Sequence, residues 1–210
     1  KFIEVGATTP LIKLENYIQK HFSDFKSILE RYGSVQIRNV ATIAGNIATA
    51  SPIGDTLPLL LSLDAKVVLT SIKKTQIVPL NNFFTGYRKT KLKKGQFIES
   101  IRIPFFPKNV FKAYKISKRF DDDISSVCAS FNLKLINRKI KNIKIAYGGM
   151  ASIPKRAKYC ERILVNSLIT DQIIEKAKKA LEQDFKPISD MRASGKYRML
   201  VAKNLLTKCF

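Results

Sequence analysis

The chain has 210 residues, of which 45% are hydrophobic and 26% are charged, and this is the composition of a soluble globular protein with a substantial core. No segment approaches the ~18 apolar residues of a membrane-spanning helix. The opening KFIEVGATTP lacks a signal-peptide pattern, so we expect a cytoplasmic protein with no membrane partner. The formal charge of +22 comes mainly from lysines spread along the chain, which favours a general lysine bias over a nucleic-acid surface.

Cysteine and histidine usage argues against a metal centre built by the protein. The three cysteines lie too far apart for a C-x-x-C pair, and the one histidine, His21, has no second ligand near it in the sequence. An odd number of thiols also fits a reducing compartment.

Two short helices are predicted near the N-terminus. Apolar residues recur at helical spacing over 11–22, with Thr9 as a candidate cap and Pro10 suited to the first helical position. A second helix can begin at Ser23 and end at Gly33.

The remaining elements follow a simple order. A short helix is expected over 57–63, and strands over 65–70, 96–106, 109–119, 125–136 and 139–150, with a strand and loop over 76–87 and a solvated turn over 89–95. From residue 155 the pattern changes to helices, over 155–166, 170–184 and 195–208. A run of strands followed by a run of helices predicts an α+β fold, and a boundary is natural at 104–108.

Residues 37–55, IRNVATIAGNIATASPIGD, form an unusual stretch with no lysine and mostly small side chains. Small residues leave backbone N–H groups unshielded, and Gly45 and Gly54 permit backbone angles closed to other residues, as a phosphate-binding loop needs. The stretch matches neither G-x-G-x-x-G nor G-x-x-x-x-G-K-[ST]. A tightly packed strand and turn that approaches another backbone is the alternative interpretation.

The order I-R-N-V-x-T-I-x-G-N-I-A-x-x-S-P-I-G-D-x-x-P resembles the FAD-binding segment of the molybdenum hydroxylase flavoproteins, the family of xanthine dehydrogenase and carbon monoxide dehydrogenase. Further similar segments follow along almost the whole chain: GYRKT, IRIP, ISKRFDDDISSVCASF, YGGM and SDMRASGKYR. The last two resemble most the small, FAD-bearing subunit of bacterial xanthine dehydrogenase.

This resemblance implies a fold and a function. Residues 1–106 would be the second half of an FAD-binding domain of the vanillyl-alcohol-oxidase (PCMH) type, and 107–210 the family's C-terminal α+β subdomain, with an antiparallel sheet and helices. The chain would be the flavin stage of purine oxidation, in which FAD accepts electrons from iron–sulfur clusters and reduces NAD. The molybdenum cofactor and the clusters would lie on partner chains or on a segment outside this sequence, which implies a hetero-oligomer.

The resemblance also assigns roles to individual residues. Tyr32 falls where relatives carry an aromatic ring against the FAD rings, and Asp55 would accept hydrogen bonds from the cofactor. Ile98 would place its backbone beside the isoalloxazine. Lys115 would stabilise negative charge on the reduced flavin. The loop against the diphosphate and ribityl chain would consist of Thr42, Ile43, Ala44, Gly45 and Asn46.

Simpler interpretations exist for several of these positions. Tyr32 could be ordinary core packing at a helix end, and Ile98 could be plain strand core. The charged loop 118–123, which in relatives edges the nicotinamide side of the flavin, could be a solvated hairpin turn. No catalytic residue and no metal ligand is assigned.

Two departures from the family pattern affect how well the chain is expected to bind FAD. Relatives usually carry a second glycine at the position of Ala44. The iron–sulfur domains and a glycine-rich diphosphate loop, which precede this segment in the family, do not occur in the sequence, so we expect these residues alone to hold FAD weakly. The alternatives are a flavoprotein subunit of a carbon monoxide dehydrogenase-like or aromatic hydroxylase, a basic module that binds nucleic acid or an acidic partner, and a structural remnant without cofactor.

Overall fold

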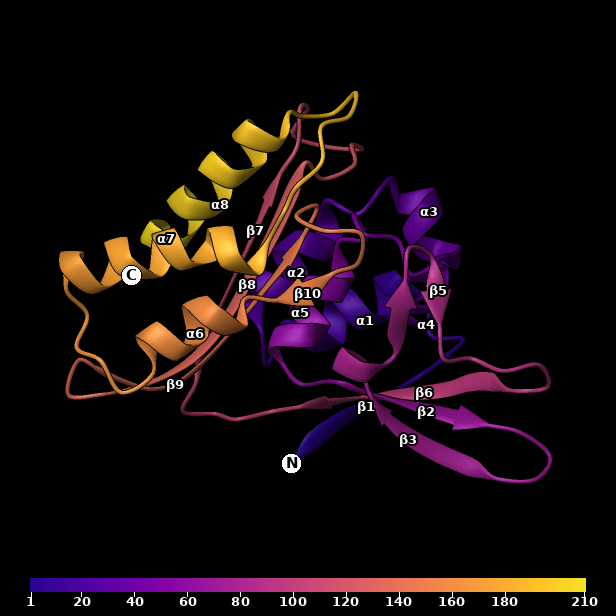
Figure 1. Ribbon diagram of the computed structural model, residues 1–210. Coiled ribbons are helices and arrows are strands. Elements are labelled where there is room, and N and C mark those ends of the chain that lie inside the picture. Colours follow the sequence, from indigo (N-terminus) through magenta and orange to yellow (C-terminus); the bar gives the residue numbers. More distant parts are fainter.

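The computed structural model describes all 210 residues and contains two four-stranded antiparallel sheets with helices around them (Figure 1). The strand order is β1-β6-β2-β3 in the first sheet and β10-β9-β8-β7 in the second. A separate two-stranded hairpin consists of β4 (Phe84–Gly86) and β5 (Lys89–Thr90). This combination of antiparallel sheets and helices confirms the predicted α+β class.

The N-terminal helices occur where the sequence predicts them. Helix α1 (Leu11–Ile18) and helix α2 (Ser23–Glu30) bury their apolar faces in the first core. The predicted cap of α1 is wrong, because Pro10 itself is the residue that flanks the helix and Thr9 makes no capping hydrogen bond. Strand β1 (Phe2–Gly6), which the sequence analysis did not predict, precedes them and pairs with β6.

The first sheet covers the N-terminal helices on one side. It contains β2 (Lys66–Thr70), β3 (Thr75–Pro79) and β6 (Phe97–Pro104), with a 3-10 turn at Leu80–Asn82 after β3. Ile101 and Ile103 of β6 are fully buried in the first core, whereas Arg102 points outward and donates to Glu4 of β1. This alternation matches the period of two that predicted the strand.

The second sheet separates two hydrophobic cores, because its strands direct alternate side chains to opposite faces. It contains β7 (Val110–Ile116), β8 (Val127–Ile136), β9 (Lys139–Gly148) and the short β10 (Lys155–Arg156). In β8, Val127, Ala129 and Phe131 belong to the second core, whereas Cys128 belongs to the first. The face toward the N-terminal half is therefore the more polar one, with Ser130 and Asn132 beside Cys128.

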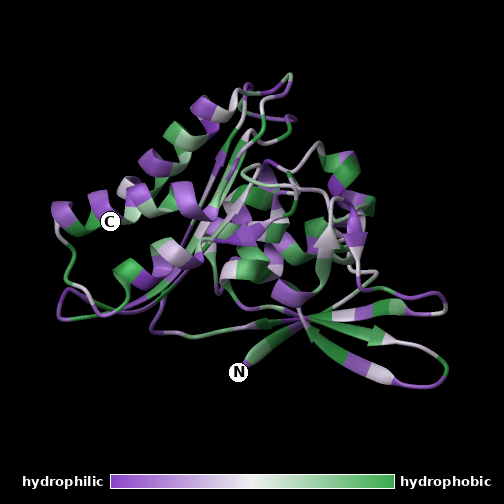
Figure 2. Ribbon diagram, in the orientation of Figure 1, coloured by the Kyte–Doolittle hydropathy of each residue, from purple (hydrophilic) through white to green (hydrophobic).

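Three helices cover the other face of the second sheet: α6 (Lys158–Leu164), α7 (Asp171–Asp184) and α8 (Gly195–Cys209). Helix α7 begins at an N-cap, Thr170, whose hydroxyl accepts from the Ile173 N–H at 3.3 Å. Figure 2 shows hydrophobic and hydrophilic residues alternating along α7, as expected of a helix with one buried face. The predicted helix over 155–166 starts later than expected, because residues 155 and 156 pair with β9 as β10.

The small-residue stretch contains two short helices, α3 (Val35–Val40) and α4 (Ile43–Thr49), before α5 (Thr56–Ser62). The strand of the alternative interpretation is therefore wrong, and the N-terminal part of the predicted loop is helix α4, whereas residues 51–54 form a turn. The phosphate-binding role stays a prediction. Thr42 caps α4 by accepting from the Gly45 N–H at 3.0 Å, and Ala50 ends it in the left-handed region with φ 49°. Ile43, Ala44 and Ile47 face the core, so the small exposed residues lie on one side of the helix.

The two halves of the chain meet where α5 packs on the second sheet. The Ser62 and Ser130 hydroxyls lie 2.7 Å apart, and the Asn132 amide donates to the Ser62 carbonyl at 3.1 Å. Asp64, just after α5, forms ion pairs with Lys144 and Arg156 of the second sheet. None of the helices has both the length and the apolar character required to cross a bilayer.

Candidate functional site

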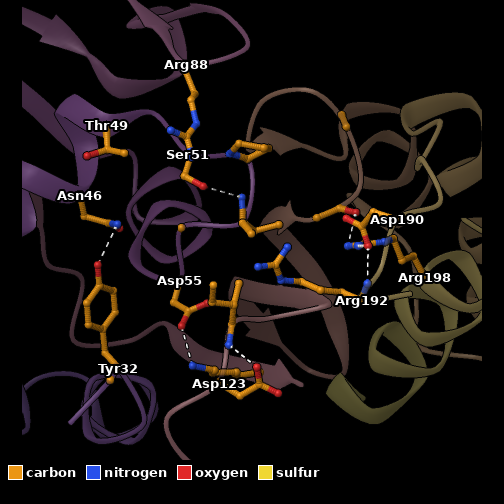
Figure 3. Close-up of a pocket in the computed structure, with 18 of the residues that line it drawn as sticks. Tyr32, Asn46, Thr49, Ser51, Asp55, Arg88, Asp123, Asp190, Arg192 and Arg198 are labelled. Atoms are coloured by element: carbon orange, nitrogen blue, oxygen red, sulfur yellow. Dashed lines mark hydrogen bonds and ion pairs between the residues drawn. The ribbon is translucent and has the colours of Figure 1, made fainter. Parts of the chain in front are cut away.

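A cavity of about 550 Å³ opens at the junction of the two halves (Figure 3). This volume is within the range of roughly 300–1,000 Å³ that is usual for small-molecule and cofactor sites. Side chains reach it from helices α3 and α4, from strand β7 and from several loops of both halves. Its polar and charged lining residues are Tyr32, Asn46, Thr49, Ser51, Asp55, Tyr87, Arg88, Lys115, Asp122, Asp123, Asp190, Arg192 and Arg198.

The deepest part of the cavity holds a buried ion pair. Lys115 Nζ lies 2.7 Å from Asp55 Oδ2 and also donates to the Arg31 carbonyl at 2.7 Å. The Ser125 hydroxyl donates to the other carboxylate oxygen. Only 1% of the Lys115 side chain and 7% of the Asp55 side chain are exposed. The pair therefore has its hydrogen bonds satisfied within the protein, as buried charges require.

One wall carries a short hydrogen-bonded chain. The Asn46 amide donates to the Tyr32 hydroxyl oxygen at 3.0 Å, and its own carbonyl oxygen accepts from the Thr56 hydroxyl at 2.6 Å. Burial, and then the negative charge of Asp55, raise the pKa of Tyr32. The Tyr32 hydroxyl therefore stays protonated at neutral pH, and its proton remains free to be donated into the cavity.

The turn over 51–54 forms a second wall, and its backbone is held in place by other backbone groups. The Gly54 N–H donates to the Ser51 carbonyl at 3.1 Å, and the Gly149 N–H donates to the Pro52 carbonyl at 2.8 Å. A Cβ at Gly54 would lie 3.1 Å from Leu57 and 3.2 Å from Asn46. Glycine at this position therefore allows the turn to lie directly against Asn46.

Cations approach the cavity from two other directions, as Figure 3 shows for Arg88 and Arg192. Arg88 follows β4, and Arg192 lies in the loop before α8. Arg198 of α8 is fully buried and holds this loop, because it donates to Asp190 at 2.7 Å and to the Gly149 carbonyl at 3.2 Å.

The charged loop 118–123 is attached to both neighbouring segments and is not only a solvated turn. Lys118 donates to the Met191 carbonyl at 2.8 Å. Arg31, just after α2, donates to the Phe120 carbonyl at 2.9 Å, and its guanidinium lies 4.4 Å from the centre of the Phe120 ring. Two backbone N–H groups, of Arg119 and Ile124, lower the pKa of Asp123.

The structure brings four of the nine predicted site residues to this cavity: Tyr32, Asn46, Asp55 and Lys115. The other five lie outside its lining, because Thr42 to Gly45 form the start of α4 and Ile98 is buried in β6. The Ala44 methyl group belongs to the first core, so it does not narrow the cavity. The cofactor contacts assigned to these nine residues stay predictions.

Several residues that line the cavity have no role predicted from the sequence. They lie in the family-like segments GYRKT, YGGM and SDMRASGKYR, and they are Arg88, Gly149, Asp190, Arg192 and Arg198. The signal was therefore present, but nothing in the spacing of these segments shows that they meet in space.

Comparison with known families identifies two family domains that together cover most of the chain. Residues 1–106 match the family described as the FAD binding domain in molybdopterin dehydrogenase, and residues 112–210 match the CO dehydrogenase flavoprotein C-terminal domain. The chain belongs to the molybdopterin dehydrogenase flavoproteins. The family resemblance inferred from the sequence is thereby confirmed.

Individual members of this flavoprotein family are similar over most of the chain. Xanthine dehydrogenase of Emericella nidulans is 36% identical over 199 residues, which cover 88% of this chain and 15% of that protein. The xanthine dehydrogenase FAD-binding subunit of Escherichia coli is 28% identical over 210 residues, 98% of this chain and 72% of that subunit. The chain thus spans about a seventh of the fungal enzyme.

Carbon monoxide dehydrogenase of Hydrogenophaga pseudoflava has the same fold as this flavoprotein chain. The two structures agree with a TM-score of 0.93 at 23% identity, over 99% of this chain and 73% of the other. At this identity the likeness establishes the fold alone.

Proposed function

We propose that this chain binds FAD in the cavity between its two halves and serves as the flavin component of a xanthine dehydrogenase-type molybdenum hydroxylase. It would hold the flavin between iron–sulfur clusters, which supply electrons taken from a purine, and NAD, which receives them. The molybdenum subunit and the iron–sulfur domains would be its partners in a cytoplasmic hetero-oligomer. The observation that carries the proposal is that motifs from both family-matched segments converge on one cavity.

The chemistry of the lining fits FAD, which combines a flat aromatic ring system with a polyol and a diphosphate. Tyr32 offers an aromatic ring, Asn46 and Ser51 offer hydrogen-bonding groups, and Arg88 and Arg192 offer positive charge. The turn at Gly54 packs against Asn46 and so fixes the position of this amide at the cavity wall. A bound flavin would supply the redox chemistry, accepting electrons and delivering them to an acceptor.

The residues of the chain would position the flavin and set its electrostatic environment. Asn46 fixes the hydroxyl end of Tyr32, and this restricts the orientation of the ring. Lys115 would stabilise negative charge on the reduced flavin, but Asp55 lies 2.7 Å from its ammonium group and offsets part of its charge. The pair therefore acts on a neighbouring charge as a dipole, whose effect is weaker than that of an unpaired lysine and depends on its orientation.

Titration of the full chain with FAD, followed by the anisotropy of flavin fluorescence, tests the binding step. We expect Tyr32→Ala to weaken binding by about tenfold or more, because the ring loses its stacking partner. Tyr17→Ala, which removes a half-exposed tyrosine that is not part of the cavity lining, is the matched control and should leave binding unchanged. Equal affinities for the wild type and Tyr32→Ala would contradict the proposal.

The acceptor can be tested separately. In the complete complex, the reduced flavin should be reoxidised by NAD under anaerobic conditions. Reoxidation by artificial acceptors but not by NAD would contradict the NAD assignment and leave the flavin assignment intact.

A second candidate keeps the flavin role and changes the substrate to carbon monoxide or an aromatic heterocycle. The match of residues 112–210 to the CO dehydrogenase flavoprotein C-terminal domain favours it. Turnover by the complete complex with xanthine, carbon monoxide and a nitrogen heterocycle compared side by side distinguishes the two candidates.

A further inference from the structure

The charge of the chain is unevenly distributed, although lysines occur throughout. All 16 acidic residues lie outside the segment 65–98, and this segment contains Lys66, Lys73, Lys74, Arg88, Lys89, Lys91, Lys93 and Lys94. The segment 124–160 also lacks acidic residues and carries eight lysines and arginines, so the composition alone does not single out one basic region. What distinguishes 65–98 is where the fold places its cations.

Two loops bring most of these cations to one end of the first sheet. The β2–β3 loop over 71–74 and the loop over 91–96 before β6 are adjacent, because Thr70 pairs with Thr75 on one side and with Phe97 on the other. Both loops project beyond the sheet at the right of Figure 1. We call this end the basic tip and define it by five exposed lysines, Lys73, Lys74, Lys91, Lys93 and Lys94. None of the five takes part in an ion pair within the chain.

The basic tip also presents apolar side chains to solvent. Ile72 is fully exposed, and Phe97, at the start of β6, is 57% exposed. The turn that carries Ile72 is ordered, since the Ser71 N–H donates to the Lys74 carbonyl at 3.0 Å and the Lys74 N–H donates to the Ser71 hydroxyl at 3.3 Å. Ile72 is thus held outward by a closed turn between two strands.

We propose that the basic tip docks on an anionic lipid surface, with Ile72 and Phe97 entering the headgroup region while the lysines bind lipid phosphates and carboxylates. An apolar anchor combined with a polybasic cluster supplies the two signals that stable but reversible membrane attachment needs. Each lysine near an anionic bilayer strengthens binding by roughly fivefold at moderate salt. Attachment should weaken as salt rises.

Charge complementarity alone would also allow an acidic protein or a nucleic acid, but the composition of the tip favours lipid. Protein interfaces are enriched in Arg and aromatic residues and depleted of Lys, whereas all five cations of the tip are lysines. Nucleic-acid interfaces are strongly polar, so a fully exposed Ile72 at the tip does not suit one. The expectation of no membrane partner rested on the absence of a long apolar segment, and peripheral docking of a loop does not need one.

Flotation of the full chain with lipid vesicles tests the proposal. We expect binding to phosphatidylcholine vesicles that contain roughly 30% phosphatidylserine, and none to phosphatidylcholine alone. The double substitution Lys73→Glu and Lys74→Glu should weaken binding by roughly tenfold or more. The control, Lys176→Glu with Lys179→Glu on α7, makes the same change in net charge at exposed positions away from the tip and should have a much smaller effect.

The apolar contribution has its own pair of variants. Ile72→Ser should weaken binding without any change in charge, whereas Leu200→Ser, at an exposed position on α8, should not. Equal losses for the two lysine pairs would overturn the proposal, because binding would then follow total charge. So would binding to random duplex DNA or polyglutamate that depends on Lys73 and Lys74 while vesicle binding does not.

Discussion

The buried pair of Lys115 and Asp55 allows a sharp prediction about stability. At 2.7 Å and an effective dielectric constant of about 20, the attraction between the two charges is about 6 kcal/mol. Removing two ions from water costs several kcal/mol each, so the intact pair adds little net stability. Removing one partner, in contrast, leaves an uncompensated buried charge. We therefore expect Lys115→Met to lower the free energy of unfolding by about 3–5 kcal/mol, or the Tm by about 6–20 °C at this chain length.

Thermal and guanidinium unfolding of the cofactor-free chain, followed by circular dichroism, measures this loss. The matched control is Lys203→Met, which breaks a solvent-exposed pair with Glu182 and should cost no more than about 1 kcal/mol. Because both charges disappear in Lys115→Met with Asp55→Asn, the double variant should cost less than the sum of the two single ones by more than about 1 kcal/mol. Strict additivity, or a loss no larger than that of the control, would refute the reasoning.

Three further predictions concern the rest of the chain. Gly149 and Gly95 have φ of +80° and +79°, but only at Gly149 would a Cβ collide with another group, the Ser126 carbonyl. Gly149→Ala should therefore destabilise the chain by about 1–3 kcal/mol more than Gly95→Ala in the same unfolding assay, and equal losses would show that this collision does not matter. Cys160 is fully buried and burial raises the pKa of its thiol, so its alkylation by iodoacetamide at about pH 8, followed by mass spectrometry, should be far slower in the folded than in the unfolded chain, and similar rates would contradict this. Burial raises the pKa of Glu161 above 4.5 despite the hydrogen bond from Arg156, so the folded state binds this proton more tightly than the unfolded state and loses stability as pH rises through the folded-state pKa. The stability of the wild type relative to Glu161→Gln should therefore fall as pH rises from 4.5, and a pH-independent difference would count against this.

Much of the fold could be predicted from local patterns. Strand β6 shows the period of two, and the predicted helices over 170–184 and 195–208 correspond to α7 and α8, which the structure caps with Thr170 and Ser194. The short helices α3 and α4 could not be found in this way, because stretches of six and seven residues are too short to show a clear apolar period. Thr42 was the available signal, since a threonine before small residues is a usual N-cap.

The site was only partly predictable, because it depends on contacts between distant parts of the chain. Lys115 and Asp55 are sixty residues apart in sequence, and only the folded structure shows that their side chains form an ion pair. Arg192 and Arg88 lie in loops whose meeting place is set by the second sheet and the β4–β5 hairpin. The spacing of Arg88 and Arg192 along the sequence does not show that they line the same cavity.

Because the second sheet directs mainly polar or small side chains toward the N-terminal half, the two halves of the chain do not depend on each other equally for folding. Without the N-terminal half, the C-terminal half would present to water the polar side chains of Ser130, Asn132 and Lys144 and, among its buried apolar side chains, only the small ones of Ala113, Cys128 and Ala146. Without the C-terminal half, α5 would lose the cover over its leucines, which are now buried. The N-terminal half therefore depends on the C-terminal half for its folding more than the reverse. We expect residues 107–210 to be the part of the chain that can fold on its own.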